Sequence, residues 1–195
     1  MEKWYILRVL IACEFSGIIR DAFIEQGHDA WSCDLLPSES NNGPHYQDSI
    51  HHVLTKTMYD WDMMIAHPPC THTAVSGARW WKDKDPQLQK DAIAFFLSLY
   101  NMDIPKICVE HPVSIISTVF RPPNQYIQPW QFGHGITKKT GLWLKNLPLL
   151  QPTNIVNGRY PTIHYELPGP EQKKNRSRTF TGIAKAMSEQ WSGIY

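Results

Sequence analysis

Hydrophobic and polar residues divide the first half of the chain into short apolar runs separated by longer mixed segments. Four runs are mostly apolar, at 6–13, 29–33, 62–66 and 106–110. Runs of this length with few polar positions are typical of parallel strands that are buried on both faces of a sheet. We therefore predict four strands of a mainly parallel sheet at these positions.

Helical spacing appears between these runs. Residues 18–26 place apolar side chains at 18, 19, 22 and 23 on one face, and Gly27 follows as a helix C-terminal cap. Residues 86–100 form the clearest helical pattern, with Asp85 as the N-cap and Pro86 in the first turn. A crossover helix of this length places the strands before and after it side by side. The alternation of strands and helices predicts an α/β, doubly wound fold.

The second half of the chain has a weaker pattern. Residues 126–132 and 140–145 alternate loosely and favour an antiparallel pair of strands, and residues 181–191 predict a last helix. The segment from about 120 to 180 is otherwise irregular and rich in proline. We predict a single domain over residues 1–195, with this irregular segment inside it.

Composition places the chain among ordinary globular proteins. It has 195 residues, 42% of them hydrophobic and 19% charged, with a net charge of +1. That charge gives no global basic field toward nucleic acid, although local phosphate contacts stay open. The four cysteines are far apart and form no CxxC pair, which is typical of reduced thiols and of neither a disulfide frame nor a zinc site. No apolar run reaches the roughly 18 residues that cross a bilayer. We expect a cytoplasmic protein without a membrane span.

The segment 62–72 carries the first candidate for chemistry. Its apolar strand is stopped at once by Pro68 and Pro69, which come directly before Cys70. Pro69 fixes its own φ at about −65°, and each proline keeps the residue before it out of helical backbone conformations. In open α/β sheets this edge, at the carboxyl ends of the strands, is where ligands bind. A cysteine on such a stiff loop suits a nucleophile, and the alternative is a small apolar residue buried beneath a loop.

Glu110 is the second candidate. It ends the strand 106–110, which should lie next to the strand that delivers Cys70. The two tips would then serve one substrate. A lone carboxylate at this place could instead form a surface salt bridge.

The first strand leads into a turn, Glu14 to Gly17, then a helix and a second strand that ends in Asp34. A doubly wound fold uses this order to bind a nucleotide-like cofactor, with the acid on the ribose hydroxyls. Because no GxGxxG run is present, an α/β unit that binds nothing at this turn stays an alternative.

Several of these motifs together resemble the DNA (cytosine-5)-methyltransferase family, and the chain looks like the small methyltransferase-like proteins of bacteriophages. Ile11–Gly17 resembles the first motif of the family, Pro68–Cys70 its nucleophile loop, and Glu110 the glutamate after a later strand. Thr181–Met187 stands where the family has a C-terminal motif. The resemblance covers most of residues 6–110 and the C-terminal helix, in the family's order. It implies the Rossmann-like fold of methyltransferases that depend on S-adenosylmethionine (SAM).

The resemblance also implies SAM as the cofactor and no metal. Asp34 matches the acid that holds the cofactor ribose, and Asp48, at the start of a short helix expected over 47–56, resembles the acid near the adenine amino group. The residues expected around the cofactor are Cys13, Glu14, Phe15, Ser16, Gly17, Asp34, Leu35, Asp48, Ser49, His67, Pro68 and Gly182.

The mechanism that the resemblance implies gives Cys70 and Glu110 their roles. The Cys70 thiolate would add to C6 of a cytosine, while Glu110 would hydrogen-bond ring N3 and the exocyclic amine. A free thiol has a pKa of about 8.5, so a nearby cation would raise the reactive fraction. His67, His72 and Arg79 are the candidates for that cation, and each is equally consistent with a plain loop residue.

The chain departs from the family at several positions. Ile18–Arg20 replace further glycines of the first motif, His67 replaces a usual glycine, and His111 replaces the asparagine that follows the glutamate. Between Phe132 and Thr181 lie fewer than 50 residues, where a full enzyme inserts a large target-recognition domain. The resemblance therefore implies a SAM site and a pyrimidine site more strongly than it implies contacts with duplex DNA.

The substrate and partners stay open between alternatives. The runs 79–82 and 173–178 mix cations with aromatic or polar residues, which suits phosphates and stacked bases but also a solvated loop and tail. The first function is a cytosine C5-methyltransferase on DNA, with a homodimer or an accessory partner supplying target contacts. The second is a C5-methyltransferase on a free pyrimidine nucleotide. The third is a non-catalytic protein that binds SAM or DNA.

Overall fold

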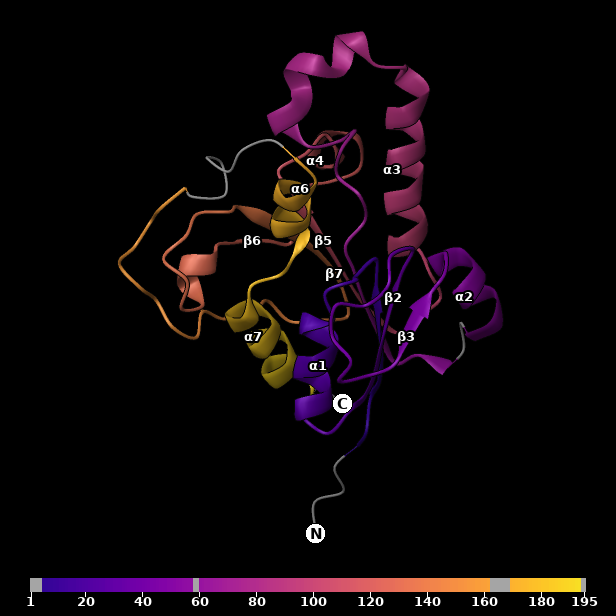
Figure 1. The fold of residues 1–195 in the computed structure, drawn as a ribbon, viewed down its shortest axis with the longest axis vertical. Coiled ribbons are helices and arrows are strands. Elements are labelled where there is room, and N and C mark those ends of the chain that lie inside the picture. The colour runs from indigo at the N-terminus through magenta and orange to yellow at the C-terminus, as the bar shows by residue number, and fades with distance from the viewer. Residues whose placement is uncertain (1–4, 58–59, 162–168, 194–195) are drawn as a thin grey trace.

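A seven-stranded mixed sheet runs through the structure, which is a computed structural model that describes residues 5–57, 60–161 and 169–193. The strand order across the sheet is β3-β2-β1-β4-β5-β7-β6 (Figure 1). The strands are β1 Arg8–Ala12, β2 Asp29–Asp34, β3 His45–Gln47, β4 Met63–Ala66, β5 Lys106–Pro112, β6 Gln125–Ile127 and β7 Thr140–Lys145.

Strand directions confirm the mainly parallel sheet. β3, β2, β1, β4 and β5 pair in parallel, and the predicted adjacency of β4 and β5 is confirmed by the register Ala66 to Val109. β7 pairs antiparallel with both β5 and β6. The antiparallel pair expected in the second half is therefore present, although its first strand ends at Ile127 because Pro129–Gln131 forms a 3-10 helix.

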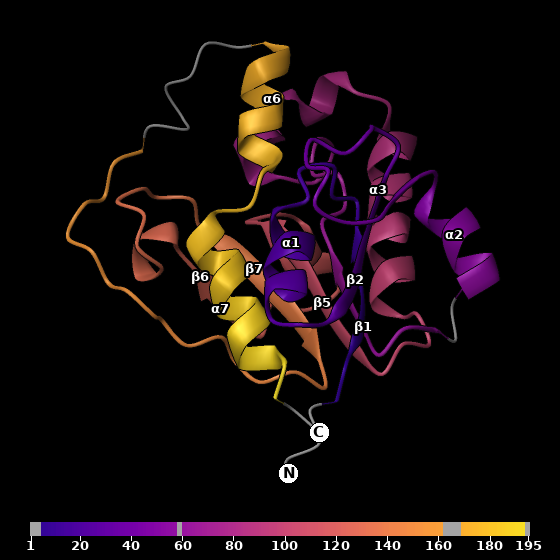
Figure 2. The same ribbon diagram turned by 60° about the horizontal axis from the view of Figure 1, so that its bottom comes forward.

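Helices cover both faces of the sheet. The α-helices are α1 Ile18–Glu25, α2 Ile50–Thr57, α3 Pro86–Tyr100, α4 Ile116–Val119, α6 Pro170–Ser177 and α7 Thr181–Trp191, and the 3-10 helices are η2 Val75–Asp83 and η3 Pro129–Gln131. α1 and α7 lie side by side on one face, and α2, α3 and α4 pack on the other (Figures 1 and 2). The result is a three-layer α/β/α arrangement.

The alternation of side chains along the central strands explains the two-sided core. In β1, Val9 and Ile11 face the cluster that holds α1 and α7, while Leu10 and Ala12 face the cluster that holds α2 and α3. Successive strand residues point to opposite faces, so a strand covered on both sides must be apolar throughout. All four residues of β4 are likewise buried.

The longest helix, α3, begins as its sequence predicts. Asp85 accepts a hydrogen bond from the backbone N of Gln87 at 2.8 Å, and Pro86 occupies the first turn, where a missing N–H costs nothing. α3 connects η2, which projects beyond the sheet at the top of Figure 1, to β5.

Four elements have no counterpart in the sequence prediction. The edge strand β3 has only three residues, η2 and α6 fall in segments expected to be loop or irregular, and the sequence predicts no element at the position of α4. Short edge strands and polar helices lack the apolar periodicity on which the prediction rests.

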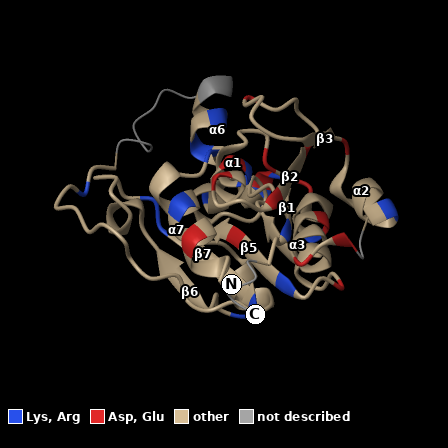
Figure 3. Ribbon diagram, turned by 90° about the horizontal axis from the view of Figure 1, so that it is seen from below, with Lys and Arg blue, Asp and Glu red and all other residues tan. Residues whose placement is uncertain are grey.

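Charged residues are spread over the elements rather than gathered by sign. Figure 3 shows Lys and Arg interspersed with Asp and Glu, and α7 for example carries the pair of Lys185 and Glu189, whose charged atoms are 3.8 Å apart. In the described ranges no helix is both long and apolar enough to cross a membrane.

Arg20, at one of the positions where the resembled family has glycines, forms buried hydrogen bonds near the turn after β1. Its side chain is fully buried on α1, and its guanidinium donates to Ser32 Oγ at 3.0 Å and to the Ser40 carbonyl at 3.0 Å. Burying an unpaired guanidinium would be costly, and these acceptors offset that cost. Arg20 therefore ties the segment 38–44, which follows β2, to the start of α1.

Candidate active site

The carboxyl ends of the parallel strands bring the candidate residues to one edge of the sheet. Cys13 follows β1, Asp34 ends β2, His67 follows β4, and Glu110 lies near the end of β5. His67 continues the pairing of β4, because its backbone N donates to the Ala12 carbonyl at 2.9 Å. This is the edge at which doubly wound folds bind ligands.

His67 and Glu110 form a direct side-chain pair across the tips of β4 and β5. Nδ1 of His67 lies 2.6 Å from Oε2 of Glu110, and the two side chains are 9% and 17% exposed. Burial alone would raise the pKa of Glu110. The hydrogen bond and charge of His67, aided by Lys138 and His111, outweigh burial and lower the pKa of Glu110 to about 2. Glu110 is therefore ionised at neutral pH.

Cys70 lies on a tightly held turn that follows the two prolines. The Cys70 carbonyl accepts hydrogen bonds from the backbone N of Thr73 at 3.1 Å and of Ala74 at 2.9 Å. Pro68 is buried, Pro69 is exposed, and Cys70 is half-buried between the edge of the sheet and solvent. The loop thus holds Cys70 in place before any substrate arrives.

The surroundings of Cys70 disfavour its thiolate in part. Burial raises the pKa of the thiol, and the negative charge of Glu110 raises it further, while Arg176 and Lys138 act in the opposite direction. The cations that favour the thiolate are therefore Arg176 and Lys138, rather than His67, His72 or Arg79. His67 is instead occupied by Glu110.

Lys138 forms a hydrogen bond with the segment 176–178. Nζ of Lys138 donates to the Arg176 carbonyl at 2.7 Å. Arg178 forms two hydrogen bonds with the carboxylate of Glu39, at 2.7 and 2.8 Å. These contacts link the segment before β7, the end of α6 and the loop after β2.

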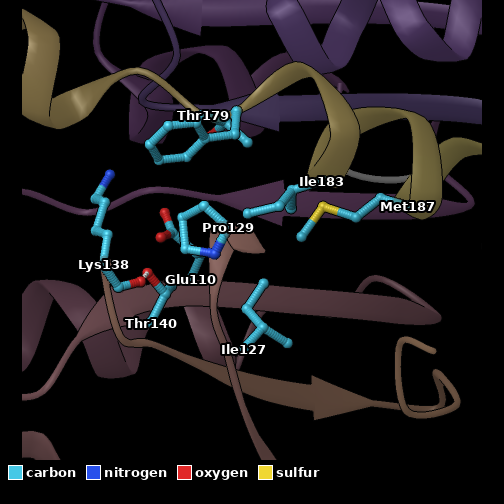
Figure 4. Close-up of a pocket in the computed structure, with 9 residues that line it drawn as sticks. Glu110, Ile127, Pro129, Lys138, Thr140, Thr179, Ile183 and Met187 are labelled. Carbon is cyan, nitrogen blue, oxygen red and sulfur yellow. Dashed lines mark hydrogen bonds between the residues drawn. The ribbon is translucent and has the colours of Figure 1, made fainter. Parts of the chain in front are cut away.

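A pocket opens beside Glu110, between β5 and β7 on one side and the start of α7 on the other (Figure 4). Ile127 and Thr140 line it from the strands, and Ile183 and Met187 line it from α7. Its further lining residues are Pro129, Lys138, Thr179 and Phe180. Sequence reasoning identified Glu110, and it placed Ile183 and Met187 in the C-terminal motif and the predicted last helix. It did not identify the other lining residues, because they come from irregular or weakly patterned segments.

His111 supports the Cys70 turn through Thr73. Nε2 of His111 lies 2.7 Å from the hydroxyl of Thr73, and that hydroxyl lies 3.3 Å from the Cys70 carbonyl. Both bonds form if neutral His111 carries its hydrogen on Nε2 and the Thr73 hydroxyl donates to the carbonyl. Burial lowers the pKa of His111 to about 4, although the charge of Glu110 acts against it. His111 is therefore neutral at neutral pH.

The turn after β1 is shaped by its own acid. The Glu14 carboxylate accepts from the backbone N of Ile19 at 2.8 Å and from the Ser16 hydroxyl at 3.2 Å, so it caps the start of α1. Cys13 and Gly17 both have positive φ, at 58° and 75°. Phe15 is buried, and its carbonyl accepts from the backbone N of Glu39 at 2.8 Å.

Asp34, the last residue of β2, and Asp48, which follows β3, differ in how many of their carboxylate oxygens already accept hydrogen bonds. Oδ1 of Asp34 accepts from the backbone N of Leu36 at 2.9 Å, and Leu35 is exposed beside it. Both oxygens of Asp48 are engaged, one by the backbone N of Ser49 at 2.6 Å and the other by His52 Nδ1 at 2.5 Å. These bonds lower the pKa of Asp48. A small hollow lies beside Asp48, between Tyr46 and the side chains of α2.

Gly182 lies apart from the turn after β1. Its backbone N donates to Nε2 of His134 at 3.1 Å, and a Cβ at this position would lie 1.9 Å from the Phe132 carbonyl. The glycine is thus required by the close approach of α7 to Phe132. Within the described ranges no cluster of His, Cys, Asp and Glu is suited to hold a metal ion.

Comparison with known proteins identifies structural neighbours only. No protein-family model and no curated protein sequence matches the chain. A solved structure of a protein encoded within an E. coli prophage, described as a DNA modification methyltransferase, superposes with a TM-score of 0.52. It is 13% identical, and the match covers 83% of this chain and 55% of that one. The Dnmt2 methyltransferase of S. pombe gives a TM-score of 0.47 at 15% identity, over 74% of this chain and 51% of that one.

The first of these likenesses and the strand order together decide the fold. The chain has the Rossmann-like methyltransferase fold. It spans about half the length of each of the two solved proteins. At this level of identity the likeness establishes the fold, and the chemistry must be argued from the site itself.

Replacing His111 with asparagine tests its buried neutral state. Because the folded pKa is about 4 and the ordinary value is 6.5, the unfolded chain binds the proton first as pH falls. The free energy of unfolding should therefore drop by about 3 kcal/mol between pH 6.5 and 4 on account of this residue. His111→Asn should remove that part of the drop, measured by urea unfolding across this range. Replacement of the exposed His51 with alanine is the control, and an unchanged slope in His111→Asn would contradict the assignment.

Proposed function

We propose that this protein is a SAM-dependent C5-methyltransferase that acts on cytosine. The observation that carries the proposal is the placement of Cys70 and Glu110 at the tips of two adjacent parallel strands. They are close enough for the charge of Glu110 to act on the thiol. In the proposed reaction one pyrimidine ring lies between the two groups, with the thiol at C6 and the carboxylate at the opposite, 3,4-edge.

The residues have complementary tasks in this reaction. Cytosine C5 is a poor nucleophile until a group adds to C6, and Cys70 is the group that adds. Glu110 binds the exocyclic amine and orients the ring against Cys70. Lys138 and Arg176 favour the thiolate by their charge, while His111 and Thr73 keep the Cys70 turn in place.

The residues at the β1 and β2 ends fit SAM. Oδ1 of Asp34 is bonded to Leu36, which leaves Oδ2, among the described residues, for a ribose hydroxyl. Positive φ at Cys13 and Gly17 turns the backbone sharply between β1 and α1, where such folds approach a cofactor. In the proposed site Asp34 and Leu35 hold the ribose side, Asp48 and Ser49 the adenine side, and residues 13–17 the remainder. Bound SAM would supply the methyl group on its sulfonium sulfur.

His67, Pro68 and Gly182 complete the cofactor residues proposed from sequence. His67 and Pro68 lie at the tip of β4, between the β1 turn and Glu110, where the methyl group must meet the base. Gly182 belongs to this set only through the packing of α7 beside α1, because its direct contacts are with Phe132 and His134.

DNA is the proposed source of the cytosine. The prophage protein with the same fold is described as a DNA modification methyltransferase, and Lys138 and Arg176 offer cations near Cys70 for a backbone phosphate. A free cytosine nucleotide is the second candidate, favoured by the net charge of +1 and the short segment between Phe132 and Thr181. On DNA, a homodimer or an accessory partner would supply further target contacts. A non-catalytic role in binding SAM or DNA leaves the placement of Cys70 and Glu110 after adjacent strands unexplained.

Methyl transfer from labelled SAM separates these functions. We expect label in mixed-sequence DNA, and Cys70→Ser should lower transfer by several orders of magnitude because a hydroxyl does not ionise at neutral pH. Cys108→Ala is the matched control, since Cys108 is buried in the neighbouring strand β5 and faces the α1 and α7 side of the core. Label in dCMP but not in DNA would favour the nucleotide substrate. An unaffected Cys70→Ser would contradict the proposed chemistry.

Loss of the Asp34 carboxylate should weaken SAM binding. Asp34→Ala removes a charged acceptor for the ribose hydroxyls, and titration calorimetry should show a loss of about 1–3 kcal/mol. Asp29→Ala is the matched control because Asp29 lies at the opposite end of the same strand and pairs with Arg8. Equal affinities for the two variants would remove Asp34 from the cofactor site.

A further inference from the structure

A backbone hydrogen bond fixes the position of His67, independently of its side chain. Its N–H donates to the Ala12 carbonyl at 2.9 Å, which fixes the residue between β1 and β5. The ring is 9% exposed, and Nδ1 lies 2.6 Å from Oε2 of Glu110. Nε2 is buried, and within the described part of the chain it has no hydrogen-bond partner. The bond to Glu110 is thus the one hydrogen bond that the structure gives this ring.

The proposed reaction requires a proton that Glu110 alone does not hold. The 3,4-edge of cytosine presents a donor, the exocyclic amine, and an acceptor, N3. An ionised carboxylate accepts from the amine but cannot donate to N3. When a thiolate adds to C6, the electrons displaced from the C5–C6 double bond reach N3, which must then gain a proton.

We propose that His67 is a positioning residue for Glu110. It fixes Oε2 through Nδ1–H so that Oε1 faces the base, and the His67–Glu110 pair carries the proton that N3 gains when Cys70 adds to C6. This inference rests on the proposed function.

The proton that leaves the His67–Glu110 pair returns to it by the end of the reaction. The Cys70 Sγ–C6 bond forms, the C5–C6 double bond becomes a C4–C5 double bond, and the C4–N3 double bond becomes a single bond. The Nδ1 proton of His67 passes to the Glu110 carboxylate, and the carboxyl group gives a proton to N3. C5 then takes up an electrophile and loses its original hydrogen to a base. Finally the Sγ–C6 bond breaks, and the proton on N3 returns to the pair. His67 acts through Glu110 and does not touch the base.

Charged and titratable groups from every neighbouring element act on this pair. From the end of β1, Glu14 is close enough for its pKa to be lowered by the charge of His67, although burial raises that pKa by more. From β5 and the segment before β7, His111 and Lys138 both favour ionised Glu110. The Cys70 thiolate would act against it. Removal of His67 leaves the burial of Glu110 in place, so Glu110 should then bind its own proton more readily.

Titration of Glu110 tests the pair without SAM or substrate. In ¹³C NMR of the side-chain carboxyl groups, with the Glu110 signal assigned from Glu110→Gln, the wild-type carboxyl should stay ionised down to at least pH 4. In His67→Ala its midpoint should rise above the ordinary value of 4.5, because burial is no longer outweighed. Identical titration curves in the two proteins would overturn the inference.

Exchange of the cytosine C5 hydrogen tests the proton. Addition of Cys70 to C6 lets C5 take up a deuteron from D₂O without SAM, so exchange in cytosine-containing DNA or dCMP reports the first step alone. At pH 7.5, His67→Ala should lower exchange by roughly 10²-fold. The loss should shrink at pH 5, where Glu110 binds a proton itself. His67→Gln still donates a hydrogen bond to Glu110 but carries no exchangeable acid proton, and it should remain impaired at pH 7.5.

The outcomes separate the inference from the proposed function. Wild-type exchange matched by His67→Ala, a loss that is equal at all pH values, or full rescue by His67→Gln would overturn the inference alone. A wild-type protein that exchanges no C5 hydrogen in either substrate would overturn the proposed function and the inference with it. His51→Ala, on α2, where the ring bonds Ser98 of α3, is the control for loss of an imidazole and should exchange like the wild type.

Discussion

The hydrogen bond between His67 and Glu110 is the interaction on which the rest of the edge depends. Burial alone would raise the pKa of this carboxyl above its ordinary value. With His67 at 2.6 Å it stays ionised, with a pKa of about 2. The bond also joins the tips of β4 and β5, the two strands that deliver Cys70 and Glu110. The parallel register sets the ends of β4 and β5 side by side, and the imidazole of His67 then favours the ionised form of the Glu110 carboxyl.

The negative charge of Glu110 disfavours the thiolate form of Cys70. Its charge adds to burial in raising the pKa of the thiol, so the site favours a negative charge on one group at the expense of the other. The positive charges of Lys138 and Arg176 act in the opposite direction and lower the pKa of the thiol. Lys138 lines the pocket beside Glu110, and Arg176 lies near the end of α6. Arg178, bonded to Glu39, holds the second segment in place. Residues after β5 therefore contribute the cations that act on the proposed thiol and carboxylate.

The sequence predicts most of the sheet because local patterns determine it. The apolar runs mark β1, β2, β4 and β5, and the helix capped by Asp85 fixes the adjacency of the last two. Cys70 and Glu110 follow from their places at strand tips. The partner of His67 does not, since it depends on side-chain orientation across two strands. Lys138 and Phe180 lie in segments without periodicity, and the three-residue strand β3 is too short to leave a pattern. The side chain of Lys173, in the predicted basic run, lies outside the described residues.

The central claim is that Cys70 forms a covalent bond with C6 of a cytosine. The most direct measurement uses DNA and dCMP that contain 5-fluorocytosine, incubated with the protein and SAM and analysed by mass spectrometry of the digested protein. Fluorine at C5 cannot leave as a proton, so the account predicts a stable adduct of protein, methyl group and base, attached at Cys70. Turnover of SAM on the normal base without such an adduct on the fluorinated one, or an adduct at Cys13, Cys33 or Cys108, would contradict the account.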